Sequence, residues 1–219
     1  MTPTAELELV ADDPTTTSGG PRRLNLIMGS VAAVAVLAAA FLTGLFWPAL
    51  TAPGDESAEA GFARDMSVHH AQAVSMAIIE YDRTSNVALK RIAFDIVVTQ
   101  QGQIGTFNGW LDDWGLSARS DGPPMDWVPG SQNMLQADGR MPGMASEAEI
   151  ERLRTLSGRE VDILFCELMI RHHLGGIHMI DAVLDRSGND KVVALATTMR
   201  NVQQAEVGTL EMFLRDLRG

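Results

Sequence analysis

The chain has 219 residues, of which 46% are hydrophobic, 5% aromatic and 21% charged, and its formal net charge is -11. This composition excludes an intrinsically disordered chain, and the length allows one or two domains. Acidic residues outnumber basic ones by 28 to 17, which argues against nucleic acid as a partner. The single cysteine, Cys166, excludes an intramolecular disulfide and a cysteine-rich metal cluster.

An uncharged apolar segment at residues 24–47 predicts a transmembrane helix. A helix of this length measures roughly 36 Å, enough to cross a hydrocarbon core of about 30 Å. Arg22 and Arg23 precede it, whereas the next basic residue is Arg64. The positive-inside rule therefore predicts a single-pass protein of the cell membrane, with residues 1–23 as a disordered cytoplasmic tail and the C-terminal domain extracytoplasmic. The alternative, a cleaved signal peptide, would have a shorter apolar region of about 7–15 residues.

Helical periodicity dominates the remaining sequence, which shows no strand pattern. Four long helices are expected, at about residues 56–82, 86–114, 159–185 and 190–217. We expect a linker at 48–57 and then a helical domain at 58–219, which consists of a first hairpin (58–116), a connection rich in Met, Gly and Pro (117–158) and a second hairpin (159–219). Capping boxes are predicted at Ser146 with Glu149 and at Ser157 with Glu160.

The two hairpins are copies of one another. The His69-His70 pair matches the His172-His173 pair at an offset of 103 residues, and a Gln-Gln dipeptide at 100–101 recurs at 203–204 with the same offset. Two separate patches that share one offset indicate an internal duplication. Two αα-hairpins of this length bury their apolar faces most economically in a four-helix bundle, so the predicted fold class is all-α.

Four of the five histidines and two glutamines are predicted to meet at one level of the bundle core: His69, His70, His172, His173, Gln100 and Gln203. His178 falls on the opposite face of its helix and is expected in solvent. Each buried polar group without a partner costs about 1–3 kcal/mol. The core therefore needs either a bound metal ion or a hydrogen-bond network that satisfies itself.

Methionines beside the histidines favour copper, as Cu(I), over harder metal ions. Met66 and Met169 each precede a histidine pair, and Met76 and Met179 recur after them in both copies. We expect one soft site formed by Met66, His70, Met169 and His173, and a second formed or supported by His69 and His172. Weaker candidate ligands are Asp65, Gln100, Gln203, Glu206, Cys166, Met141 and Met144.

The favoured function is that of a membrane-anchored, extracytoplasmic metal-binding protein that buffers, delivers or confers resistance to copper. Another transition metal could take the place of copper, and the protein could form a homo-oligomer. Catalysis is not required for this function. The alternative is a metal-free structural or interaction module at the membrane surface, whose buried His/Gln network specifies the packing of the bundle. A redox enzyme with a dinuclear centre is a third interpretation, but it needs more carboxylates than the helices supply.

The motifs Asp65-Met-Ser-Val-His-His, Met-Pro-Gly-Met at 141–144 and Leu168-Met-Ile-Arg-His-His resemble the ferritin-like family known as domain of unknown function 305 (DUF305). The resemblance covers residues 58–217 and implies a duplicated four-helix bundle, usually exported. Some members of the family are associated with copper binding or copper tolerance, whereas most have no assigned activity. By position, the paired histidines of the family are His69, His70, His172 and His173, and its Met-rich connection matches Met141 and Met144.

Overall fold

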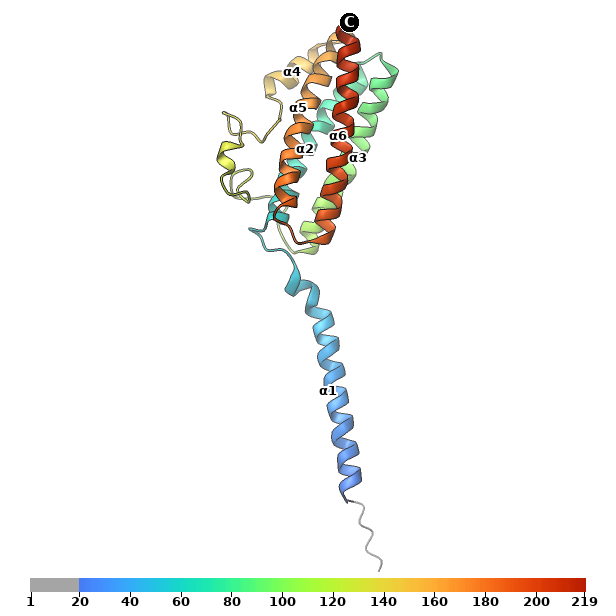
Figure 1. Ribbon diagram of the computed structural model, residues 1–219, viewed down its shortest axis with the longest axis vertical. Coiled ribbons are helices and arrows are strands. Elements are labelled where there is room, and N and C mark those ends of the chain that lie inside the picture. The colour runs from blue at the N-terminus through green and yellow to red at the C-terminus, as the bar shows by residue number, and fades with distance from the viewer. Residues whose placement is uncertain (1–19) are drawn as a thin grey trace, which may run out of the picture. The chain divides into compact units, whose positions relative to one another are not determined.

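The computed structural model describes residues 20–219, with the backbone alone described at 20–25, 27, 45–50 and 132. The described chain contains one short 3-10 turn, η1 (Ser131–Asn133), six α-helices and no strand (Figure 1). The helices are α1 (Gly20–Thr51), α2 (Ala58–Arg83), α3 (Val87–Asp113), α4 (Glu147–Thr155), α5 (Arg159–Leu184) and α6 (Asp190–Arg218). The predicted all-α class is confirmed.

The chain divides into two units between Thr51 and Ala52. In the first unit, α1 includes the predicted segment 24–47 and extends beyond it, so it takes in residues 48–51 of the predicted linker. Across the described residues, no helix combines the length and the apolarity needed to cross a membrane, and the transmembrane helix stays a prediction. The predicted tail lies outside the described residues except for 20–23, which belong to α1.

The second unit is a bundle built from two helical hairpins, α2 with α3 and α5 with α6, in which α2 also packs against α5 (Figure 1). Helices α2 and α5 run antiparallel, as contacts at their two ends show. At one end the Arg83 guanidinium donates to the Leu156 carbonyl at 3.2 Å, and at the other the Ser187 hydroxyl donates to the Glu59 carboxylate at 2.7 Å. This arrangement brings the middle of α2 beside the middle of α5.

The duplication extends to the turns that connect the helices of each hairpin. Asn86 caps α3, where its side-chain oxygen accepts from two backbone N–H groups, and Asn189 caps α6 in the same way. The Asn86 backbone N–H donates to Thr84 at 3.0 Å, and the Asn189 backbone N–H donates to Ser187 at 3.1 Å. Both pairs of equivalent residues are 103 positions apart, so the two turns are built from the same local hydrogen bonds.

The two predicted capping boxes have different outcomes. The box at Ser146 and Glu149 forms, because each side chain bonds the backbone N–H of the other residue, and it begins α4. The box at Ser157 and Glu160 was wrong: the N-cap of α5 is Gly158, which makes no side-chain hydrogen bond. Gly158 has a φ of 59°, a left-handed conformation that glycine adopts without steric cost. The N-cap is therefore one residue later than predicted, while α5 itself begins at Arg159 as expected.

Apolar side chains of the bundle form two separate core clusters. The first includes Phe62, Phe107, Met179 and Met199, and the second includes Ala77, Ile96, Phe165 and Leu210. Along each of the four long helices, residues of one cluster are followed by residues of the other, and the change occurs where the histidines and glutamines lie. A polar layer thus divides the hydrophobic core.

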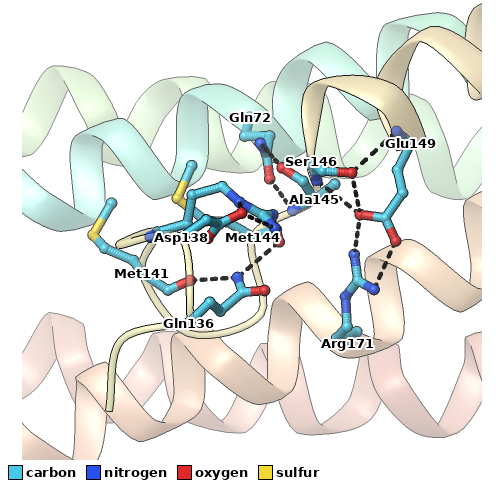
Figure 2. Close-up of polar contacts among 10 residues, drawn as sticks. Gln72, Gln136, Asp138, Met141, Met144, Ala145, Ser146, Glu149 and Arg171 are labelled. Atoms are coloured by element: carbon cyan, nitrogen blue, oxygen red, sulfur yellow. Dashed lines mark hydrogen bonds and ion pairs between the residues drawn. The ribbon is translucent and has the colours of Figure 1, made fainter. Parts of the chain in front are cut away.

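The connection between the hairpins is held against the bundle by hydrogen bonds. Near its start, one oxygen of Asp65 accepts from the backbone N–H of Met125 and from the indole N–H of Trp127, both at 2.8 Å. Near its end, the Gln72 side chain forms two hydrogen bonds with the Ala145 backbone. Within the connection, the side-chain amide of Gln136 donates to two backbone carbonyls of the same segment, both at 2.9 Å (Figure 2). The connection is therefore an ordered part of the fold.

Two glycines let the connection approach α5 closely. A Cβ on Gly175, in the middle of α5, would overlap the Pro142 carbonyl, and a Cβ on Gly143 would overlap the Arg171 carbonyl. Gly143 also has a φ of 76°, which disfavours other residues. These contacts place the Pro142 carbonyl over the centre of the bundle.

We predict that Gly175→Ala destabilises the protein by about 1–3 kcal/mol, because the added methyl group forces the connection away from α5. The matched control is Gly208→Ala in α6, where a Cβ has no neighbour within 4 Å. There the replacement should stabilise the helix by about 0.5–1 kcal/mol. Chemical denaturation measures both. Equal effects of the two substitutions would show that the connection does not depend on this contact.

Candidate metal centre

The polar layer consists of eight residues, four from each hairpin: His69, His70, Gln100, Gln103, His172, His173, Gln203 and Glu206. All four histidines are at most 1% exposed, and Gln100 and Gln203 are also buried. His178, which was expected in solvent, is exposed. The structure brings the four histidines together, and Gln203 lies beside His69 at Gly176. We call these eight residues the histidine layer.

Equivalent hydrogen bonds hold one histidine of each copy. His70 Nε2 lies 2.7 Å from Gln103 Oε1, and His173 Nε2 lies 2.6 Å from a carboxylate oxygen of Glu206. In both cases the partner is one helix away and 33 positions later in the sequence. Amide and carboxylate oxygens only accept, so the imidazole Nε2 carries the proton in each pair.

The other histidine pair lies at the contact between α2 and α5. The rings of His69 and His172 pack with their centroids 3.8 Å apart at an interplanar angle of 35°. His69 Nε2 lies 3.0 Å from the Pro142 carbonyl, which only accepts, so this nitrogen also carries a proton. Neither ring nitrogen of His172 has a hydrogen-bond partner.

Seven buried nitrogen and oxygen atoms in the histidine layer have no hydrogen-bond partner: Nδ1 of His69, His70 and His173, both ring nitrogens of His172, and Oε1 of Gln100 and Gln203. In a neutral imidazole whose Nε2 carries the proton, Nδ1 presents a bare lone pair. Metal-binding histidines in proteins show this pattern, in which one nitrogen donates to an oxygen and the other binds the metal. The layer therefore has an excess of electron-pair donors that a cation would satisfy.

Burial keeps the imidazoles of His69, His70 and His172 neutral. It lowers the pKa of His69 to about 4 and that of His70 to about 3, and it also holds the pKa of His172 well below the usual 6.5. Desolvation of the charged form is the largest cause in each case, and the other histidines add repulsion. Neutral imidazoles are the form that binds metal ions.

A protein family and several solved structures match this chain. The chain matches the family described as Domain of unknown function (DUF305) over residues 59–214. The chain belongs to the DUF305 family. It shares 41% identity and a TM-score of 0.69 with the crystal structure of a DUF305 protein from Streptomyces coelicolor, covering 76% of this chain and 97% of that one. No curated protein matches the chain.

Two further solved structures resemble this DUF305 chain. A DUF305 fragment from Deinococcus radiodurans has 31% identity and a TM-score of 0.60, covering 73% of this chain and 96% of that one. CopM in its Cu(I)-bound form has 19% identity and a TM-score of 0.56, covering 74% of this chain and 99% of that one. The similarity to CopM shows a common fold.

The predicted thioether ligands of this DUF305 protein fall on both sides of the histidine layer. Met66 and Met179 belong to the first core cluster, and Met76 and Met169 belong to the second. The structure therefore does not bring Met66 and Met169 together, because α2 and α5 run antiparallel and equivalent residues point to opposite ends. Each cluster instead contributes one methionine from each copy.

The weaker candidates have different roles or positions. Asp65 holds the connection, as described, and burial raises its pKa. Met141 is buried in the first cluster, and Met144 packs against it half-buried. Cys166 lies in the second cluster, where burial raises the pKa of its thiol to about 12, so it is not a thiolate at neutral pH. Among the described residues, no three His, Cys, Asp or Glu side chains lie close enough together to coordinate one metal ion.

Sequence reasoning missed three features. Gln103 was not among the candidate ligands, although it is the equivalent of Glu206 at the offset of 103 and could have been found from that match. The backbone carbonyl of Pro142 carries no sequence signal. Finally, Glu80 and Asp162 form a buried acidic pair in which burial, reinforced by Asp162, raises the pKa of Glu80 to about 8.

We predict that the metal-free protein loses stability as the pH falls from about 6.5 to 5. The unfolded chain binds protons at its histidines below pH 6.5, whereas folded His69 and His70 bind them only near pH 4 and 3, so each contributes a slope of about 1.4 kcal/mol per pH unit. Glu80 acts in the opposite sense, because its pKa is raised on folding. Denaturation at several pH values measures the net slope.

Two variants separate these contributions. Glu80→Gln removes the opposing group, so its stability should fall more steeply toward acid than that of the unmodified protein. His178→Ala, which removes an exposed histidine, serves as the control for the loss of a histidine outside the layer. A stability that is constant or higher at pH 5 in the Glu80→Gln variant would contradict the neutral, buried state of the layer.

Proposed function

We propose that this protein binds copper in the histidine layer and serves in copper buffering, delivery or resistance. The observation that carries the proposal is the set of buried acceptor atoms without partners, above all Nδ1 of His69, His70 and His173. A layer that only needed to satisfy itself would pair these atoms with donors from within the bundle, whereas a layer that binds a cation keeps them available.

The chemistry of the available donors favours copper. The histidine layer offers imidazole nitrogens, and each core cluster beside it offers thioethers. Among the eight residues of the layer, Glu206 is the only acid. Magnesium and calcium require mainly oxygen ligands, whereas most of the unpartnered atoms in this layer are imidazole nitrogens. Imidazole and thioether together suit Cu(I), and imidazole also suits Cu(II). Another transition metal that accepts imidazole would use the same residues.

Structural relatives support the proposal. CopM, which has this fold at 18–19% identity, has been crystallised in Cu(I)-bound, Cu(II)-bound and Ag-bound forms. Silver(I) resembles Cu(I) in its preference for soft ligands. The support is independent of the hydrogen-bond pattern, because it comes from other chains of the same architecture.

The proposed ligands are the imidazoles of His69, His70, His172 and His173. Thioethers would come from the adjoining clusters, Met66 with Met179 on one side and Met76 with Met169 on the other. When bound, copper would take electron pairs from these donors. The bonds at Nε2 would hold the rings in place, so little reorganisation of the hydrogen-bonded histidines is required.

We predict that the double substitution His70→Ala and His173→Ala abolishes tight Cu(I) binding by the full-length protein. The two substitutions remove one imidazole from each copy and leave the stacked pair of His69 and His172. Competition with a Cu(I) chelator measures the affinity, and circular dichroism verifies that the variant is folded. His178→Ala is the matched control, because His178 lies on the exposed face of α5, the helix that carries His173. This variant should bind as tightly as the unmodified protein.

The alternative, a metal-free structural network, has a different outcome. Bound copper at 100 times its dissociation constant should raise the free energy of unfolding by about 2.7 kcal/mol. This gain should be lost in the double variant if the layer binds copper. If the network is purely structural, the variant is destabilised equally with and without copper, and the copper function is wrong.

We also propose that residues 24–47 anchor the bundle to the cell membrane, with the bundle on the extracytoplasmic side. The support is the uncharged sequence of this segment and the preceding Arg22 and Arg23.

The anchoring proposal predicts that the full-length protein stays in the membrane fraction after alkaline carbonate extraction. Replacement of Ala39 and Ala40, in the middle of the segment, by aspartate should release it, because each charge in a membrane costs about 2.5–3.5 kcal/mol. Protease added to intact cells should digest the bundle. Quantitative release of the unmodified protein would refute the anchor and leave the copper proposal untouched.

A further inference from the structure

The two halves of the histidine layer differ at one equivalent position. Gln103 and Glu206 are related by the offset of 103, and each accepts from Nε2 of the second histidine of its pair, at 2.7 and 2.6 Å. The side chains have nearly the same shape, and the hydrogen bonds have nearly the same length. The difference is that one acceptor is a neutral amide and the other is a carboxylate.

This difference changes the donor strength of the opposite ring nitrogen. A carboxylate that accepts from one imidazole nitrogen increases the basicity of the other, as in the carboxylate–histidine–metal arrangement of many metal sites. A neutral amide has a weaker effect, because the hydrogen bond lacks the charge. Nδ1 of His173 is therefore a stronger electron-pair donor than Nδ1 of His70.

The charge of Glu206 also acts on any cation in the layer. The other seven residues of the layer are histidines and glutamines, so Glu206 supplies its only carboxylate. The Glu206 side chain is 21% exposed, so it lies at the margin of the layer, while His173 beside it is 1% exposed. A single negative charge stabilises a divalent ion more than a monovalent one in such a low-dielectric core.

We propose that Glu206 is a positioning residue that makes the His173 half the stronger half of the copper site and shifts the preference of the site toward Cu(II), whereas Gln103 keeps the His70 half suited to Cu(I). The inference rests on the proposed function. It assigns Glu206 the role of orienting and activating a ligand through Nε2, in place of the direct metal contact that the sequence suggested as a weaker option.

The structure itself supplies the substitutions that test this. Glu206→Gln reproduces in the second half the His–Gln pair that the first half already contains, and it removes the charge while an acceptor remains. Gln103→Glu reproduces the His–Glu pair in the first half. Because each variant copies a geometry present in the molecule, loss of folding is not the expected outcome.

The experiment measures Cu(II) and Cu(I) affinities of the full-length protein by chelator competition, together with the reduction potential of the bound copper. Glu206→Gln should weaken Cu(II) binding about 10–100-fold and change Cu(I) binding much less, so the potential rises. Gln103→Glu should strengthen Cu(II) binding selectively and lower the potential. Matched controls are Glu211→Gln in α6 and Gln101→Glu in α3, both at exposed positions, which should change neither ratio.

The outcomes separate this inference from the proposed function. If the unmodified protein binds copper and both variants keep its ratio of Cu(II) to Cu(I) affinity, Glu206 is only structural and the inference is overturned while the copper function stands. If the unmodified protein binds neither ion, the copper function fails and the inference fails with it. If Glu206→Gln does not fold, the opposite shift expected of Gln103→Glu still decides the question.

Discussion

Hydrogen bonds at imidazole Nε2 determine what the core of this bundle can do. His69, His70 and His173 each meet a protein oxygen at this nitrogen, from Pro142, Gln103 and Glu206 respectively. A neutral imidazole has one proton, so fixing it on Nε2 leaves the electron pair on Nδ1. Because the rings are buried, that electron pair has no access to solvent. The bundle thus maintains a costly arrangement that a bound cation would compensate.

The packing of the helices is arranged around this layer. Antiparallel packing of α2 against α5 brings the two histidine pairs to the same level and separates the equivalent methionines. Met66 and Met179 end in one apolar cluster, and Met76 and Met169 end in the other. The duplication therefore yields an approximately two-fold core, in which soft sulfur atoms from both copies flank the imidazoles above and below.

The connection between the hairpins breaks this symmetry. Only one copy of it exists, and its Pro142 carbonyl accepts from His69, whereas the equivalent His172 has no partner on either nitrogen. Gly143 and Gly175 make this approach possible, because a side chain at either position would collide with backbone. The difference between Gln103 and Glu206 breaks the symmetry as well. As a result the four histidines are chemically distinct, although the duplication gives two equivalent His-His pairs.

Residue spacing along the chain was enough to predict the four long helices, the internal duplication, the inward direction of four histidines and the outward direction of His178. These follow from the period and the rise of the α-helix, which convert spacing along the chain into a face and a height. The family resemblance was likewise contained in the histidine and methionine motifs, and the match over residues 59–214 confirms it.

Which atoms of those residues are available depends on contacts between segments that are far apart in the sequence. Whether an imidazole donates through Nε2 depends on oxygens from another helix or from the connection, and Pro142 acts through its backbone, which residue identity does not reveal. The separation of Met66 from Met169 depends on the relative direction of two helices far apart in the sequence. Gly158 is the N-cap of α5 in place of the expected Ser157, because local capping signals compete with the path that the chain must take. Such outcomes depend on long-range contacts, and helical periodicity carries no information about them.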